Sequence, residues 1–204
     1  MSKVDENPTI LSSARRRILD TAQELFYQRG FRAVGIDEIV AQSDVAKATL
    51  YVHFGSKDRL IAAYLQRQSD DLRAYLEKEI MPGEGGAAAR LDRIFRMIER
   101  GCRNPSFRGC PFINFAVEFP DRATPGWEVC LAHRSWFRGF VAAIAREGGA
   151  EDPDLLAEQW CLLYDTAMVG SMFDGGHSAE VAREMANRLV STALARRRDM
   201  PLHR

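Results

Sequence analysis

The sequence predicts an all-α protein, and three features of the chain support this fold class. Apolar residues recur at the 3.6-residue spacing of a helix through most of the 204 positions. Prolines and glycine pairs separate these periodic segments, as they do at helix starts and ends. No alternating apolar and polar stretch is long enough to predict a strand. With 46% hydrophobic residues, the chain can also bury a substantial core.

Near the N-terminus, two short helices meet across a tight turn. The first carries Ile36, Ile39 and Val40 at positions i, i+3 and i+4. The turn follows at residues 42–45, and the second helix continues to Phe54. Helices joined in this way indicate a helix-turn-helix, a motif that places its second helix in the major groove of double-stranded DNA. By itself the segment also fits a short amphipathic helix in an ordinary bundle.

Helical geometry divides the second helix into a buried face and an outward face. At about 100° per residue, Leu50 and Phe54 fall nearly on one line and form the packing face. The outward residues are small, apolar or hydroxylated, which suits thymine methyl groups and close approach to base edges, and a lysine in the first turn suits guanine. We therefore expect the bases to be read by Lys47, Ala48, Thr49, Tyr51 and Val52.

With its flanks, this segment resembles the TetR/AcrR family of bacterial transcriptional regulators over roughly residues 14–65. The motifs that carry the resemblance are Arg17-Ile18-Leu19-Asp20-Thr21-Ala22-Gln23-Glu24-Leu25-Phe26, Arg29-Gly30-Phe31, Gly35-Ile36-Asp37-Glu38-Ile39-Val40-Ala41, Lys47-Ala48-Thr49-Leu50-Tyr51-Val52-His53-Phe54 and Ser56-Lys57-Asp58. The resemblance implies about nine helices, with a DNA-binding domain at residues 12–57 and a ligand-binding and dimerisation domain at residues 58–204. It also implies that His53 and Lys57 contact phosphates.

Three positions depart from the usual pattern of that family. Ala46 replaces a serine that often caps the recognition helix, and loss of such a cap typically costs about 1 kcal/mol. Asp44 replaces a glycine, and aspartate tolerates the left-handed backbone conformation better than most residues. Val52 replaces a more usual polar or aromatic residue. These departures bear on which operator sequence is read, not on the mode of DNA binding.

The charge balance argues against a protein that binds DNA without sequence preference. The 28 basic and 28 acidic residues cancel, and residues 1–60 carry a net charge of only +1. Sequence-independent binding depends on many phosphate contacts, so the placement of each cation has to matter more than the total. Arg15, Arg16 and Arg17 cluster at the start of the first helix, where they fit either phosphate contacts or a solvated turn.

Composition also bears on the compartment and on chemistry. No run of eighteen apolar residues predicts a transmembrane helix, and the N-terminus has no apolar signal segment, so we expect a cytoplasmic protein with no membrane partner. In that reducing compartment the four scattered cysteines are expected to be thiols, not disulfides. We expect no metal, no cofactor and no catalytic residue, because no nucleophile, zinc-ligand or phosphate-loop motif is present. A Cys110–His133 pair is the one conceivable nucleophile and base, and nothing fixes its geometry.

The rest of the chain is expected to be helical. The predicted segments are approximately 57–80, 87–102, 111–119, 127–146, 153–173 and 178–198. In the family that the chain resembles, the last two long helices of each subunit pack as a four-helix dimer interface. Here the small residues Ala167, Gly170 and Ser171 would permit close helix contact, and the stripe Val181, Met185, Leu189 and Ala193 is apolar. We therefore expect a homodimer; in the other interpretation, both helices complete the core of one chain.

The remaining helices are expected to enclose a small-molecule effector. Ligand pockets are mostly apolar with a few convergent polar groups, and this half of the chain is rich in aromatic residues. Aromatic residues at helical spacing also build cores, so each position has both interpretations. The expected lining residues are Phe112, Asn114, Phe115, Glu118, His133, Trp136, Phe140 and Tyr164. Glu118 would favour a cationic ligand or would only cap a helix or pair with an arginine.

Together with the resemblance, these features predict a sequence-specific, homodimeric transcriptional regulator that is released from operator DNA by a small, largely apolar ligand. That it represses transcription, and does not activate it, is implied by the resemblance alone. Two other functions on the same scaffold stay open. In one, Cys110 senses electrophiles or oxidants, because thiols near helix N-termini can have a lowered pKa. In the other, the protein is an architectural DNA binder without a ligand.

Overall fold

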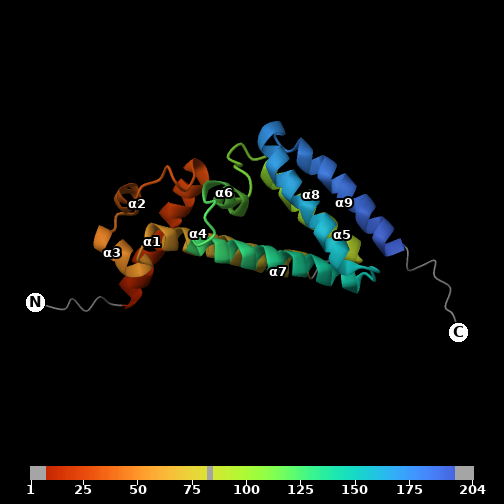
Figure 1. Ribbon diagram of the computed structural model, residues 1–204, viewed down its shortest axis with the longest axis horizontal. Helices are drawn as coiled ribbons and strands as arrows, with labels where there is room; N and C mark the ends of the chain where they lie inside the picture. The colour runs from red at the N-terminus through yellow and green to blue at the C-terminus, as the bar shows by residue number, and fades with distance from the viewer. Residues whose placement is uncertain (1–7, 82–84, 196–204) are drawn as a thin grey trace, which may run out of the picture. The chain divides into compact units, whose positions relative to one another are not determined.

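The computed structural model describes residues 8–81 and 85–195 of the chain. These residues are helical and contain no strand, which confirms the predicted fold class (Figure 1). The elements are α1 (Pro8–Arg29), α2 (Ile36–Ser43), α3 (Lys47–Phe54), α4 (Lys57–Tyr75), η1 (Leu76–Ile80), α5 (Gly86–Cys102), α6 (Pro111–Glu118), α7 (Pro125–Glu147), α8 (Pro153–Asp174) and α9 (His177–Ala195). Three expectations lie partly or wholly outside the described residues: the N-terminus without a signal segment, the helix end after Ile80 and the end of the last helix at Arg198.

The chain forms two compact units. The first holds α1, α2, α3, the part of α4 up to Ser69, α6 and the start of α7 up to Cys130. The second holds the rest of α4, η1, α5, the rest of α7, α8 and α9. The sequence placed the domain boundary between residues 57 and 58 and did not anticipate that α6 packs in the same unit as the helix-turn-helix.

The core of the first unit is built around an aromatic trio from α1, the loop after it and α4. The ring centroids of Phe26 and Phe31 lie 5.4 Å apart, and both rings lie about 6 Å from Tyr64. All three residues are almost fully buried, and Leu50 and Phe54 of α3 are buried in the same unit. Packing of these large rings fixes α1 against the start of α4, because interiors of this density tolerate little displacement.

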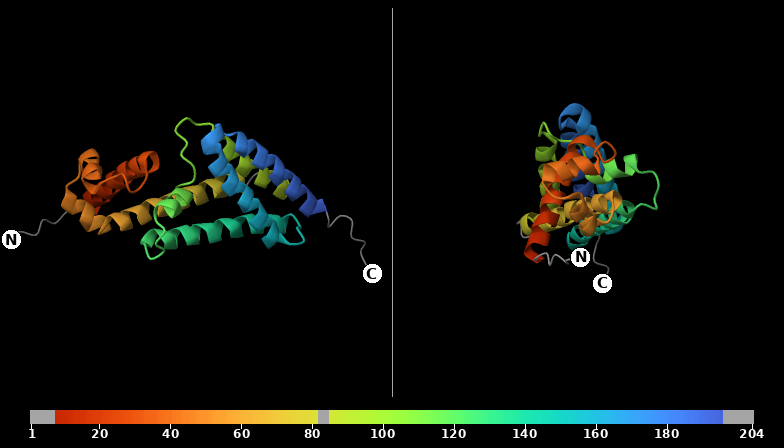
Figure 2. Two further views of the ribbon diagram at one scale, coloured as in Figure 1. Left: turned by 45° about the horizontal axis from the view of Figure 1, so that its top comes forward. Right: turned by 90° about the vertical axis from the view of Figure 1, so that its left-hand side faces the viewer.

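The second unit is a bundle in which α8 and α9 lie side by side along most of their length (Figures 1 and 2). Small residues make this approach possible within one chain. Ala167 and Ser171 are buried, and a Cβ atom added to Gly170 would lie only 2.3 Å from the Ser178 Oγ. The close helix contact that these small residues permit is therefore made between α8 and α9 of the same chain.

A polar network attaches α9 to α5 in this unit. Arg183 lies 3.3 Å from a carboxylate oxygen of Asp92 and 3.1 Å from one of Glu99. The Asn187 amide donates to Asp92 over 2.8 Å, and Arg96 contacts the same carboxylate. These donors hold the pKa of Asp92 below its usual value despite its partial burial. The α5–α9 contact is thus fixed by charge as well as by apolar packing.

Candidate nucleic-acid interface

The turn between α2 and α3 is sharp because one residue takes the left-handed conformation. Asp44 has φ 50° and ψ 49°, and its backbone N–H donates to the Val40 carbonyl. The Ser43 hydroxyl donates to the same carbonyl over 3.3 Å, and Val45 is buried directly after the turn. Asp44 thus adopts the left-handed conformation that an aspartate was expected to tolerate at this position. At the start of α3, Ala46 takes the N-cap position and supplies no side-chain hydrogen bond, as expected.

The α3 helix buries one face and exposes the other, as its sequence predicts. Leu50 is completely buried and Phe54 nearly so. On the other side, Val52 is 76% exposed and Tyr51 43% exposed. The remaining predicted base-reading residues are Lys47 and Ala48, which are exposed, and Thr49, which is half-buried. The structure therefore presents a mostly uncharged surface of apolar and hydroxyl groups, which can approach base edges closely.

Two cations near this surface, Lys47 and Arg17, are paired with carboxylates of the same unit. The Lys47 Nζ lies 2.6 Å from Asp37 Oδ1, and this hydrogen bond raises the pKa of Lys47. Arg17 lies 3.9 Å from Asp44. Both pairs are well exposed to solvent, so each contributes little to stability. Each cation can therefore exchange its carboxylate for a DNA group at low cost.

The two predicted phosphate ligands lie near the C-terminal end of α3, His53 within this helix and Lys57 just after it. His53 is half-buried, its ring packs edge-on against Phe54 at 6.3 Å, and its Nε2 is buried with no partner among the described residues. A phosphate contact as placed would therefore use Nδ1. Lys57, at the start of α4, is also half-buried, and burial lowers its pKa, although the Asp58 and Glu118 charges oppose that shift.

Glu118, at the end of α6, contacts the backbone of the helix-turn-helix unit. Its Oε1 accepts a hydrogen bond from the Phe31 N–H over 3.1 Å, and its Oε2 accepts one from the Arg32 N–H over 2.8 Å. Gly30 precedes them with φ +87°, and a Cβ atom there would lie 2.8 Å from the Glu118 Oε1. The Glu118 carboxylate thus binds backbone N–H groups of the protein itself.

The aromatic residues of α6 also pack inside the first unit. Phe115 stacks on Phe119 at 4.8 Å and meets Phe31 edge-on at 5.7 Å. A Cβ atom on Gly126 would lie 2.4 Å from the Phe115 ring, so only glycine fits beside it. Phe112 is buried and Asn114 is half-buried in the same unit. The four expected pocket residues of α6 therefore lie in the helix-turn-helix unit, and Phe112 and Phe115 are buried in its core.

The other four expected pocket residues form an aromatic cluster in the second unit. Phe137 lies at its centre, with Tyr164 at 4.8 Å, Trp136 at 5.9 Å and His133 stacked at 6.3 Å. Phe140 packs on Trp136 at 5.9 Å. Sequence reasoning omitted Phe137 from the site, because an aromatic residue at helical spacing gives no sign of whether it is central or peripheral.

Burial and nearby cations change the protonation of this aromatic cluster. His133 is buried, and desolvation, together with the positive charges of Arg73 and Arg134, lowers its pKa to about 4. Desolvation raises the pKa of Tyr164. Arg73, which the sequence did not single out, lies over the Trp136 ring at 4.3 Å. Near neutral pH the cluster therefore presents a neutral imidazole and a neutral phenol.

The four cysteines lie in the described ranges, and no disulfide joins them. Cys102, Cys110 and Cys130 are buried, and Cys161 is half-buried. Desolvation raises the pKa of Cys102 and raises that of Cys161 to about 12. No group of three potential metal ligands occurs among the described residues, and no helix in them is long and apolar enough to cross a membrane.

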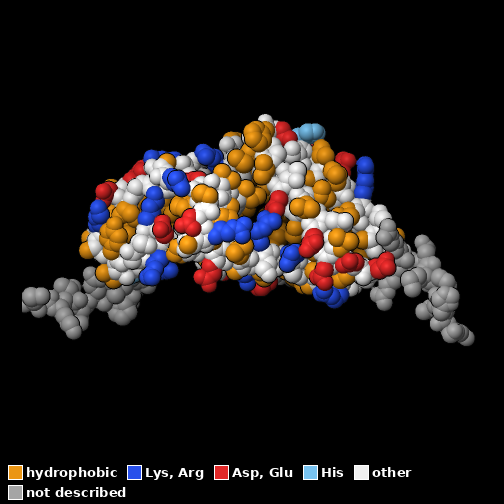
Figure 3. Space-filling view, viewed as in Figure 1, with side chains coloured by type: hydrophobic (Ala, Val, Ile, Leu, Met, Phe, Trp, Pro, Cys, Tyr) orange, Lys and Arg blue, Asp and Glu red, His pale blue; other side chains and the backbone are white. Residues whose placement is uncertain are grey.

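An apolar surface lies on the outer side of α8 and α9 (Figure 3). Its most exposed members are Phe173 at 85% and Leu162 at 65%, and it also includes Leu155, Val169, Met172, Val181 and Met185. Leu189, expected on the same stripe, is half-buried and packs against the core. Of the predicted apolar stripe, Val181 and Met185 are therefore exposed, whereas Leu189 packs against the core.

A recognition helix with an exposed face, a tight left-handed turn before it and a helical second unit together define a helix-turn-helix DNA-binding transcriptional regulator. The profile of bacterial regulatory proteins of the tetR family matches residues 18–64. SCO4454, a TetR-family transcriptional regulator from Streptomyces coelicolor, has 37% sequence identity to this chain. Its crystal structure matches with a TM-score of 0.78 over 91% of this chain and 96% of that one. The chain belongs to the TetR family of transcriptional regulators, which are not enzymes.

Two comparisons with NemR extend over most of the chain, and one with FasR covers a shorter segment. The HTH-type transcriptional repressor NemR of Escherichia coli K12 is 26% identical over 155 residues, which are 74% of each chain. The crystal structure of the reduced form of E. coli NemR has a TM-score of 0.79 at 19% identity, covers 86% of this chain and 95% of that one, and shares the fold. The HTH-type transcriptional activator FasR of Mycolicibacterium smegmatis is 47% identical over 58 residues, 28% of this chain and 26% of that protein.

Proposed function

We propose that this protein is a homodimeric repressor that binds operator DNA through α3 and leaves it when a small, largely apolar molecule binds. The observation that carries the DNA-binding part is the exposed face of α3, where Val52 and Tyr51 are held outward by the buried Leu50 and Phe54. Base contacts are made by Lys47, Ala48, Thr49, Tyr51 and Val52, and phosphate contacts by His53 and Lys57. Repression, as opposed to activation, is supported by the relative NemR, whose name describes a repressor.

Dimer formation is supported by the apolar surface on α8 and α9. Large exposed apolar side chains gathered on neighbouring helices mark sites of protein association. A two-fold dimer also suits a helix-turn-helix, because it presents two recognition helices to half-sites about 34–36 Å apart or somewhat more. The second copy of the chain would cover residues such as Leu162, Phe173 and Met185, which are exposed in one chain.

Effector binding is supported by the aromatic cluster of the second unit. Trp136, Phe140 and Tyr164 supply apolar surface, and the neutral His133 supplies a hydrogen-bonding group, which together match the composition of small-molecule sites. α4 and α7 are the helices that continue from this unit into the first. A shift of α4 on effector binding would change the separation of the recognition helices, with a coupling free energy of about 1–3 kcal/mol.

The proposal is tested by selecting operators from a random duplex library and measuring affinity by fluorescence anisotropy. A selected motif with two-fold symmetry and nanomolar affinity at physiological salt supports a sequence-specific dimer. Binding of equal strength to every duplex would support the architectural alternative instead. A thermal-shift screen of small apolar compounds, followed by anisotropy with each hit, then tests release by a ligand.

Thiol-based sensing through Cys110 is the second candidate on this scaffold. It is supported by the relative NemR, of which a reduced form has been crystallised. Cys110 directly precedes α6, but its side chain is only 8% exposed, which limits attack by an electrophile. Labelling with N-ethylmaleimide under native conditions distinguishes the candidates. Rapid modification of Cys110 with loss of operator binding would favour thiol sensing, and slow modification favours the non-covalent effector.

A further inference from the structure

Two arginines from different helices lie against the C-terminal end of α3. The Arg15 guanidinium of α1 lies over the Phe54 ring, with its Cζ 5.2 Å from the ring centroid. A Cβ atom on Gly55 would lie 3.5 Å from the Arg59 Nη1 and 3.7 Å from the Arg59 Cδ, so this side chain of α4 lies along Gly55. The last residue of α3 and its C-cap thus each have a guanidinium beside them.

Both guanidiniums are accessible to an anion. Arg15 and Arg59 are exposed, and neither forms an ion pair with a carboxylate of the described residues. The exposed Asp58 neighbours Arg59 in the chain but is not paired with it. At the other end of α3, Arg17 and Lys47 do have carboxylate partners. The C-terminal end of the recognition helix therefore presents guanidiniums whose charge no ion pair offsets.

The position of Arg59 relative to the base-reading face follows from helical geometry. At about 100° per residue, position 55 falls between Tyr51 and Val52, both of which are exposed. Arg59 therefore lies at the border of the outward face of α3, and Arg15 lies about 100° away, over Phe54 on the packing face. When a helix lies in the major groove, side chains at its borders meet the phosphates that line the groove. The fork of a guanidinium fits two phosphate oxygens.

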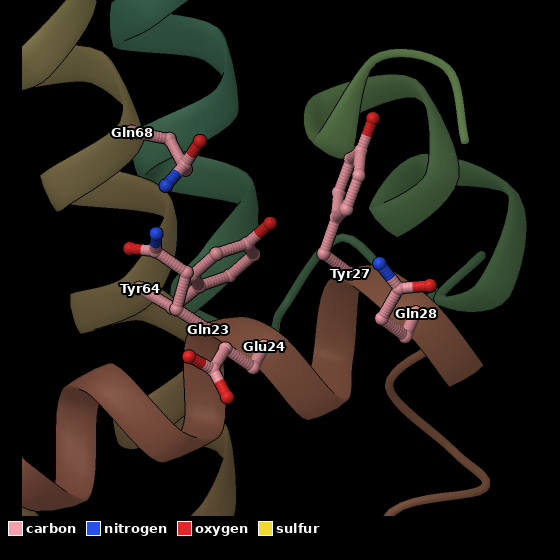
Figure 4. Close-up of a pocket in the computed structure, with 6 residues that line it drawn as sticks. All are labelled: Gln23, Glu24, Tyr27, Gln28, Tyr64 and Gln68. Atoms are coloured by element: carbon pink, nitrogen blue, oxygen red, sulfur yellow. The ribbon is translucent and has the colours of Figure 1, made fainter. Parts of the chain in front are cut away.

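The helices that carry the two arginines are fixed to each other. Tyr64 of α4 lies beside Gln23 of α1 (Figure 4). The Tyr64 ring also packs against Phe26 of α1, with 6.0 Å between the ring centroids. An ion pair between Arg67 and Asp20 joins the same two helices. Both arginines therefore extend from one rigid frame, which lowers the conformational entropy lost when they bind DNA.

We propose that Arg15 and Arg59 bind phosphates of the DNA backbone at the C-terminal end of α3 and fix the position of this end in the major groove. This inference rests on the proposed DNA-binding function and adds two anchors to the phosphate ligands His53 and Lys57. The Phe54 ring positions the Arg15 guanidinium, because an aromatic face attracts a cation within about 6 Å. Phosphates carry no base identity, so the two anchors strengthen binding to every sequence.

Fluorescence anisotropy at several salt concentrations tests the anchors on the selected operator and on a random duplex. Arg15→Gln and Arg59→Gln should each reduce the salt slope by about 1 on both duplexes, and the double variant should reduce it by about 2. Arg15→Lys should keep the slope and weaken binding, because an ammonium lacks the guanidinium fork. Arg16→Gln is the matched control. It removes the same charge from the next exposed position of α1 and should leave the slope unchanged.

Neutral methylphosphonate, placed at one position of the operator at a time, locates each contact. At the phosphate that Arg15 binds, this change should weaken the wild type but not Arg15→Gln, and the same holds for Arg59. Unchanged slopes in both single variants, or an equal loss in Arg16→Gln, would overturn the proposal while leaving DNA binding through α3 in place. A wild type that binds neither duplex would instead overturn the proposed function as well.

Discussion

Replacing Glu118 by glutamine should measure how strongly α6 is fixed to the helix-turn-helix unit. Each oxygen of this carboxylate accepts one backbone N–H, at 3.1 Å from Phe31 and 2.8 Å from Arg32. The amide of glutamine keeps one acceptor oxygen and turns an NH2 group toward the other N–H, so one hydrogen bond is lost and two donors face each other. Hydrogen bonds to charged groups contribute about 1.5–3 kcal/mol when part-buried, and the Arg32 bond is exposed, so we expect a loss of about 2 kcal/mol.

The assay is urea and thermal unfolding of the full chain together with hydrogen exchange of the two amides. A loss of about 2 kcal/mol corresponds to a fall of roughly 4–8 °C in Tm for a chain of this size. The Phe31 and Arg32 amides should exchange faster than in the wild type. Glu128→Gln, at an exposed glutamate of α7 in the same unit, serves as the control and should change neither quantity. Unchanged stability and unchanged exchange of Arg32 in the Glu118 variant would refute the reasoning.

Three further predictions concern assembly, pH and DNA. Met185→Lys places a charge on the apolar surface of α9 and should yield monomers by light scattering, whereas Leu131→Lys, at an exposed apolar position of α7, should stay dimeric; a dimeric Met185 variant would exclude this surface. His133 binds a proton in the unfolded chain near pH 6.5 but in the folded chain only near pH 4, so the unfolding free energy should fall by about 3 kcal/mol as pH drops through that window. His133→Phe should remove this component of the pH dependence, and identical profiles would show that the residue does not titrate as described. Lys57→Ala should weaken binding to all duplexes alike and reduce the salt slope by about 1, and a change confined to one sequence would argue for a base contact.

The helices and the two faces of α3 were predictable from sequence, because the spacing of apolar residues indicates which side of a helix is buried. Leu50 and Phe54 are buried, and Val52 is exposed, as the 100° rotation requires. The left-handed Asp44 was predictable for a similar reason, because few residue types accept that backbone conformation.

What each buried face packs against was not predictable in the same way. The small size of Gly170 and Ser171 lets α9 of the same chain approach α8 closely. The sequence shows that these residues are small but does not show which helix packs against them. Glu118 has the spacing of a pocket residue relative to Asn114, yet its carboxylate binds backbone amides more than eighty positions away in the chain. Such long-range partners depend on the tertiary arrangement, which local periodicity does not encode.

The most direct test of the central claim, that α3 reads DNA bases through its exposed face, is operator selection with the wild type and with Val52→Ala in parallel. Val52 is 76% exposed, so its truncation leaves the fold intact and removes only two methyl groups from the surface. The account predicts a two-fold symmetric motif for the wild type and a relaxed preference at one base pair per half-site for the variant, with discrimination there reduced by about 1 kcal/mol or more. Identical motifs and affinities for the two proteins would contradict it.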